Sequence, residues 1–332
     1  MSYVNTVLGP IHADELGVTA SHEHVFWGPP GWEYDPEWWF HPPKVFAKCL
    51  NDLRDYRELG GDTIVCCSGV GLGRDVEFYA MLSKFSGVNI VMGSGFHEGR
   101  NISPHFARQD IDYMTDLFVR ELTEGIGNTG IKAGFIKVGH SHVDISELED
   151  QQHRAAARAS MRTGCAVITH GAWFGIEELD IFESEGLDLS RVIVSHCSAS
   201  EAINLDRDKE MAKRGAFCSY DTFTIEPTWN MADYAGIDEL KVDALKGFID
   251  AGLTDQLIIS SDVNLFSVGW ARSAPLAGKS TMADLLRYIP GLLSRVGIDE
   301  ELFWRVLVDN PKKVLPFIEV TAQSSASQIA AE

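Results

Sequence analysis

The chain has 332 residues, 48 of them acidic and 28 basic, so its formal net charge at pH 7 is −20. This balance argues against a nucleic-acid partner, because affinity for a polyanion depends on clustered Lys and Arg side chains and the sequence has no such cluster. Hydrophobic residues make up 45% of the chain, yet no apolar run is long enough to span a bilayer, so we expect no membrane contact.

The start of the chain and its cysteines indicate a cellular compartment. No basic segment followed by an apolar one opens the sequence, so no signal peptide is predicted and we expect a cytoplasmic protein. The six cysteines are scattered and form no CxxC pair. This usage favours reduced, mostly buried thiols over disulfides or a thiolate zinc site.

Short apolar and β-branched segments recur along nearly the whole chain and predict strands. The segments cover residues 17–25, 62–68, 89–95, 134–139, 165–170, 191–196, 215–220 and 256–262. Amphipathic stretches lie between them, as at 44–59, where apolar residues recur at helical spacing. Another predicted helix begins after Ser146, where Glu149 completes a capping box, and ends at Gly164.

Eight strands alternating with helices imply parallel pairing with right-handed crossovers. The simplest closed arrangement is a (β/α)8 TIM barrel, an α/β fold whose catalytic residues come from the carboxyl ends of the strands. A doubly wound open sheet is the alternative, but no GxGxxG follows the first strand. We expect one domain over residues 1–320 and a disordered tail over 321–332.

Polar residues with metal-ligand chemistry stand at the ends of these predicted strands. They are His22 and His24 on the first strand, Lys137 on the fourth, His170 on the fifth, His196 on the sixth and Asp262 on the eighth. Each is weak evidence alone, since a single histidine or aspartate more often makes a hydrogen bond or a cap. Together they predict a centre of imidazoles and carboxylates, the ligand set of zinc and similar metals.

Lys137 is an ammonium group inside an apolar strand. Its ordinary fate is to snorkel to water or to pair with an acid. Burial beside positive charge would instead lower its pKa and leave a neutral amine. Such an amine can add carbon dioxide to give a carbamate, an anion with two oxygens that suits a bridge between two metals.

These motifs resemble the phosphotriesterase family of the amidohydrolase superfamily, and in particular its phosphotriesterase-like lactonases. The resemblance runs from about Gly9 to about Leu315 and is carried by HEH, IKVG, THG, SHC, SSD and the closing NPKKVL. It implies a binuclear site at the carboxyl ends of the barrel strands. One metal would be held by His22, His24 and Asp262, the other by His170 and His196, with carbamylated Lys137 bridging them.

The resemblance also implies a mechanism. Zinc is the expected metal, although cobalt, manganese or iron would suit the same ligands. A metal-bridging hydroxide would attack the substrate, and Asp262 would take its proton and pass it toward the leaving group. Asp262 and Lys137 are therefore the predicted catalytic residues.

Two positions depart from the lactonases of the family and bear on the substrate. His97, in GFHEGR, stands where they carry a tyrosine, and Thr222 follows Asp221 where they carry an arginine, so both are candidate substrate-binding residues. His97 either replaces the tyrosine as a hydrogen-bond donor near the metals or is an ordinary loop histidine. We expect a small-molecule substrate, a lactone or another carboxylic ester of apolar character. A phosphotriester or an amide is the alternative, and a non-catalytic ligand-binding barrel is a more distant one.

Further candidates lie in the loops. Trp27 opens an aromatic first loop over residues 26–43, which either walls an apolar pocket, packs on the barrel or forms a dimer interface. Trp270 and Arg272 follow Asp262 and are placed in a lid by position alone. His140 and His142 are read as polar loop residues. A homodimer is expected from the resemblance and the aromatic loop.

Overall fold

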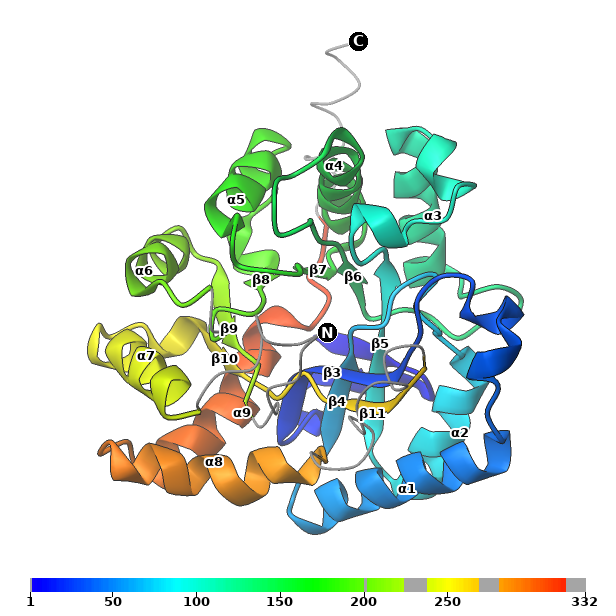
Figure 1. Ribbon diagram of the computed structural model, residues 1–332. Coiled ribbons are helices and arrows are strands. Elements are labelled where there is room, and N and C mark those ends of the chain that lie inside the picture. Colours follow the sequence, from blue (N-terminus) through cyan, green and yellow to red (C-terminus); the bar gives the residue numbers. More distant parts are fainter. Residues whose placement is uncertain (1, 200–201, 224–237, 269–280, 321–332) are drawn as a thin grey trace.

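A parallel sheet surrounded by helices dominates the computed structural model, which describes residues 2–199, 202–223, 238–268 and 281–320 (Figure 1). Its nine strands run in the order β10-β9-β8-β7-β6-β5-β4-β3-β11, and every neighbouring pair is parallel. The bounds are β3 (Thr19–Trp27), β4 (Thr63–Cys66), β5 (Asn89–Gly95), β6 (Phe135–Lys137), β7 (Ala166–Ile168), β8 (Val192–Val194), β9 (Phe217–Tyr220), β10 (Leu257–Ile259) and β11 (Asn264–Ser267). The predicted strands correspond to β3 through β10, which confirms the parallel α/β pattern.

Helices alternate with these strands and cover the outside of the sheet (Figure 1). They are α1 (Pro42–Glu58), α2 (Val76–Ser86), α3 (Ile111–Thr123), α4 (Glu147–Thr163), α5 (Gly175–Ser184), α6 (Leu205–Lys213), α7 (Asp238–Asp250), α8 (Ala283–Arg295) and α9 (Glu300–Val314). The predicted start of α4 is confirmed: Ser146 and Glu149 form the capping box, and Gly164 ends the helix with φ 77°.

The two ends of the strand order meet at one short segment. β10 and β11 lie at opposite ends of the order, yet only residues 260–263 separate them in the chain. Within that segment the Asp262 amide donates to the His22 carbonyl at 3.0 Å, and the His24 amide donates to the Val263 carbonyl at 2.9 Å. The sheet therefore curls until β3 lies beside the chain that leaves β10.

An N-terminal hairpin was not predicted. β1 (Tyr3–Thr6) and β2 (Gly9–His12) pair in antiparallel fashion, separately from the main sheet. Val4 of β1 is fully buried in the same apolar cluster as Val65 and Phe135 of the main sheet. Four-residue strands that include Gly9 and Pro10 give too little periodicity to be recognised from sequence.

Three further expectations concern the whole chain. All six cysteines are buried and free, as predicted. The expected disordered tail over 321–332 lies outside the described residues. Within the described residues, no helix combines the length and the apolar character needed to cross a bilayer.

Candidate active site

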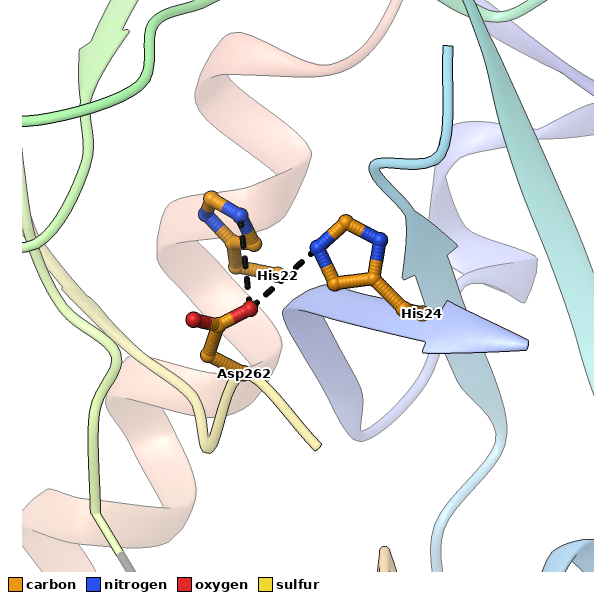
Figure 2. Close-up of side chains that lie close together, drawn as sticks. All are labelled: His22, His24 and Asp262. Carbon is orange, nitrogen blue, oxygen red and sulfur yellow. Dashed lines mark ion pairs between the residues drawn. The ribbon is translucent and has the colours of Figure 1, made fainter. Parts of the chain in front are cut away.

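His22, His24 and Asp262 form one corner of a buried cluster (Figure 2). The two histidines lie two residues apart on β3, so both side chains leave the same face of the strand. Asp262 Oδ1 lies 3.3 Å from His24 Nε2 and 3.8 Å from His22 Nε2. Their ligand-type atoms all lie within 4.8 Å of one another, a spacing that one metal ion could occupy.

His170 and His196 form a second corner. His170 Nδ1 lies 2.9 Å from His196 Nε2, and both rings are almost fully buried. The corners are adjacent, because His196 Nδ1 lies 3.9 Å from Asp262 Oδ2 and the His22 and His196 ring centroids are 4.7 Å apart. Imidazoles converge here from β3 and from the loops after β7 and β8.

Lys137 ends β6 beside His22 and is fully buried. Its Nζ donates to the Thr169 carbonyl at 2.7 Å and lies 3.3 Å from His22 Nε2. Burial lowers the pKa of the Lys137 amine, which favours its neutral, reactive form. Burial is the main cause that lowers the pKa of His22 to about 3, so that histidine is neutral, the form that binds metal.

Three of these side chains, those of His170, His196 and Asp262, lie just past the carboxyl ends of strands. His170 and His196 each lie two residues past a strand and Asp262 lies three past β10, so the predicted strands are slightly too long at these ends. His196 and Asp262 have φ of 64° and 55°, the left-handed region that residues other than glycine rarely adopt. Strain of this kind collects at functional sites, where the surrounding contacts hold it in place.

Asp221 is a site residue whose role the sequence did not reveal. It follows β9 and is fully buried, with Oδ1 at 2.9 Å from His196 Nδ1 and Oδ2 at 3.0 Å from His22 Nδ1. Burial acts to raise the pKa of Asp221, but the two histidines outweigh it and hold that pKa well below its usual range. Asp221 faces Nδ1 of both rings, so Nε2 would be the atom of each ring that could reach a metal. Its position after the seventh predicted strand was the available signal.

Glu23 is a second buried carboxylate that the sequence analysis did not assign. It stands between the two histidines of β3 and is fully buried. Its oxygens accept hydrogen bonds from the segment that carries Asp262, not from the histidines. Burial raises the pKa of Glu23 to about 8, while these hydrogen bonds act in the opposite direction.

His97, a predicted substrate residue, lies beside the cluster. Its ring centroid is 3.7 Å from that of His170, and its Nδ1 lies 3.2 Å from Asn101 Nδ2. The same Nδ1 lies 3.6 Å from Glu98 Oε1. In the tautomer in which Nδ1 accepts from Asn101, a neutral His97 carries its proton on Nε2. Burial lowers the pKa of His97 to about 4, although Glu98 acts against that shift.

The other predicted substrate residues lie in different settings. Trp27 ends β3 and is half-buried. Thr222 is fully buried, with its hydroxyl 2.9 Å from that of Ser198 and its carbonyl accepting a bond from Lys241. Trp270 and Arg272 lie outside the described residues.

The aromatic first loop packs against the sheet. Trp32 lies 5.0 Å, centroid to centroid, from Phe26 of β3 and 5.6 Å from Phe40, and Phe40 lies 5.0 Å from Phe266 of β11. Tyr34 is 89% exposed, so not all of the loop joins this cluster. Of the three alternatives for the loop, a pocket wall, packing on the barrel or a dimer interface, these rings show packing against the sheet.

His140 and His142 join the loops after β6 and β7. His140 Nε2 lies 3.0 Å from the Gly171 carbonyl and 3.5 Å from Glu178 Oε1, while the His142 ring stacks on Trp173 with centroids 4.0 Å apart. Neither histidine belongs to the candidate metal groups of the described chain. Both are therefore loop contacts beside the site.

A curled parallel sheet with buried imidazoles and carboxylates at its carboxyl edge is an α/β architecture suited to divalent metals. Comparison with known proteins identifies the family. The phosphotriesterase family model matches residues 2–315, so the chain belongs to the phosphotriesterase family. Membership of this metal-dependent family, together with relatives named as hydrolases, makes the protein an enzyme of the hydrolase class.

Three relatives illustrate the range of the family. The phosphotriesterase homology protein of Mycobacterium tuberculosis is 29% identical over 95% of this chain and 98% of its own. The aryldialkylphosphatase of Saccharolobus solfataricus is 27% identical over 91% of this chain and 96% of its own. The N-acetyltaurine hydrolase of Salmo salar is 29% identical over 95% of this chain and 98% of its own.

Proposed function

We propose that the protein is a binuclear metal-dependent hydrolase built on a closed (β/α)8 barrel that forms one domain over residues 1–320. The observation that carries this proposal is the convergence of six separately predicted ligands into one buried cluster. His22, His24 and Asp262 would hold one metal, and His170 and His196 the other. Zinc is the expected metal, with cobalt, manganese or iron as substitutes.

Lys137 would bridge the two metals as a carbamate. Its buried amine, with a lowered pKa, can add carbon dioxide and release a proton, which converts a repelling cation into an anion. The Nζ lies 3.3 Å from His22 Nε2 and 2.7 Å from the carbonyl of Thr169, the residue before His170, so the carbamate would form beside ligands of both proposed metals. The cost of a buried ammonium beside metal cations would then disappear.

The protein residues orient the reaction. Two bound metals would supply a bridging hydroxide near neutral pH and would polarise the substrate oxygen. Asp262, at the edge of both corners, would accept the proton of the nucleophile and pass it to the leaving group. A neutral His97, with its Nε2 proton, would donate a hydrogen bond to the substrate.

We propose a lactone or another carboxylic ester of apolar character as the substrate, with Trp27 and His97 beside the acyl group. Thr222, Trp270 and Arg272 stay predicted substrate contacts. An amide is the second candidate, because several relatives are named N-acetyltaurine hydrolase. A phosphotriester is the third, because one relative is named aryldialkylphosphatase. A homodimer and a cytoplasmic location complete the proposal and rest on the sequence alone.

The test is a hydrolysis screen of metal-reconstituted protein with Asp262→Asn as the control. Proton release reports on lactones, aryl esters and phosphotriesters, and the appearance of free amine reports on N-acyl amines, whose hydrolysis releases no net proton near neutral pH. We expect acid release from lactones or esters that is absent in the variant. Amine release from an N-acyl amine alone, or acid release from a phosphotriester alone, would replace the substrate class while keeping the site. Inactivity of protein with two metals bound, on every class, would favour the non-catalytic barrel.

A further inference from the structure

Glu23 makes three hydrogen bonds to a single segment of chain. Its Oε1 accepts from the Ser260 hydroxyl at 2.7 Å and from the Ser261 amide at 2.9 Å, and its Oε2 accepts from the Val263 amide at 2.7 Å. The accepted amides therefore lie on either side of Asp262. These bonds turn the carboxylate toward that segment, and Glu23 belongs to neither candidate metal group of the described residues.

Asp262 needs such support because its own backbone is unfavourable. With φ of 55° it occupies the left-handed region, which is unfavourable for residues other than glycine and persists only where surrounding contacts hold it. Neighbouring bonds fix the same segment to β3: Asp262 donates to the His22 carbonyl at 3.0 Å, and His22 donates to the Ser260 hydroxyl at 2.9 Å. Glu23 completes this set of contacts from the side chain.

Glu23 also lies on the strand that supplies the other two ligands of the same corner. Successive residues of a strand point to opposite faces, so His22 and His24 share one face while Glu23 leaves the other. One strand therefore carries two imidazoles into the site and a carboxylate that holds the third ligand's turn. The separation of Asp262 from both histidines is fixed through β3.

We propose that Glu23 is a positioning residue that holds the left-handed turn of Asp262 and thereby sets the geometry of the metal shared by His22, His24 and Asp262. This inference rests on the proposed metal-dependent function. All three bonds are donated to Glu23, so both of its oxygens act as acceptors, as in an ionised carboxylate, and these bonds favour that form against the effect of burial. An amide has one acceptor oxygen and an NH2 group that would oppose a backbone N–H. Glu23→Gln keeps the shape and removes the complementarity.

The experiment measures metal binding in the full-length protein. Wild type and Glu23→Gln are reconstituted with zinc, and the affinity for each ion is measured by competition with a chelator. Thermal unfolding of the same samples is recorded separately. We expect the affinity for one of the two zinc ions to fall about 10- to 100-fold in Glu23→Gln, the usual cost of losing a partner of a ligand, with the second ion less affected. In the cobalt-loaded form, the visible spectrum of one ion should change.

Two control variants separate positioning from general stability. Glu121 is a buried glutamate of α3 that accepts from both terminal nitrogens of Arg74 and from the Ser94 hydroxyl and touches no candidate ligand. Glu121→Gln should lower the melting temperature and leave both zinc affinities unchanged. Ser260→Ala removes one of the three donors to Glu23, together with the acceptor of the His22 amide, and should weaken the same ion by a smaller factor.

Either failure can be recognised. Wild-type protein that binds no zinc would refute the proposed function itself. Wild-type protein that binds two ions, with Glu23→Gln binding both at unchanged affinity while only its melting temperature falls, would show that Glu23 is structural and would overturn this inference alone. Loss of both ions to the same extent in Glu23→Gln would also overturn it, because the proposal concerns only the corner that contains Asp262.

Discussion

At the level of single residues, Lys137 is the side chain whose chemistry changes most between the polypeptide and the proposed enzyme. We expect Lys137→Ala to lose metal affinity and activity together, by more than about 100-fold. Loss of a residue that only hydrogen-bonds to a metal ligand already lowers metal affinity or activity about 10- to 100-fold, and Lys137 is proposed as a ligand itself. A small carboxylic acid such as acetate should partly restore both, since it supplies the missing bridging oxygens. Metal content and turnover with and without acetate are the measurements. Full activity of the plain variant would exclude the bridging role.

Asp221 is a second single residue with a predicted effect, because it contacts one histidine of each corner. Each of its oxygens lies about one hydrogen-bond length from the Nδ1 of a different candidate ligand, at 3.0 Å for His22 and 2.9 Å for His196. Asp221→Asn should therefore weaken both metals, by about 10- to 100-fold each, in contrast to the single metal affected by Glu23→Gln. Ser195→Ala, which removes the hydroxyl 2.9 Å from His22 Nδ1, should weaken one metal only. Equal binding by Asp221→Asn and wild type would contradict this reading.

Among the elements, the loops after β5, β6 and β7 approach one another closely at Gly139, which has no side chain. A Cβ at Gly139 would overlap the His97 carbonyl and the Cβ of His170, so these loops can meet only around a glycine. We expect Gly139→Ala to destabilise the fold by about 1–3 kcal/mol, the usual cost of overpacking, and to lower turnover by displacing His97 and His170. Chemical denaturation and steady-state kinetics measure the two effects.

Gly291 gives a matched control for that substitution. It is an exposed position inside α8, and a Cβ there would meet nothing within 4 Å. Gly291→Ala should leave turnover unchanged and stabilise the protein by about 0.5–1 kcal/mol through helix propensity. A stability loss as large as that of Gly139→Ala would show that the crowding around Gly139 is not the cause.

For the whole molecule, the buried histidines predict that the metal-free protein is acid-sensitive. Burial lowers the pKa of His22 to about 3, that of His97 to about 4 and that of His170 well below its usual value of 6.5. Between these values and pH 6.5 the unfolded chain binds more protons than the folded one, so stability falls as the pH is lowered through this window. Glu23 acts in the opposite sense, because its pKa is raised, but three histidines outweigh it below pH 6.5.

Thermal unfolding in the presence of EDTA tests this prediction between pH 7.5 and pH 4.5. The melting temperature of the metal-free protein should fall steadily below pH 6.5. His97→Gln should show a shallower fall, since one of the three buried histidines is gone. A melting temperature that stays constant over this range would mean that these histidines take up protons without unfolding the chain.

Much of the fold could be read from local sequence. The recurring apolar segments gave the positions of β3 to β10, and Ser146, Glu149 and Gly164 marked the ends of α4, because caps and strand periodicity are local properties. The hairpin of β1 and β2 was missed, since its stability comes from Val4 packing among residues far away in the chain. The segment from β10 to β11 was likewise predicted as a simple strand end.

The sequence by itself determined the chemistry that is available: the paired histidines of β3, the lysine in an apolar strand, and the strand-end histidines and aspartate that resemble the phosphotriesterase family. These signals survive in sequence because each depends on a residue type and its neighbours. Only the tertiary structure decided how Asp221 joins His22 to His196 and how Glu23 holds Asp262. These carboxylates contact groups up to 240 positions away along the chain. A contact between residues so far apart in the sequence leaves no local sequence pattern.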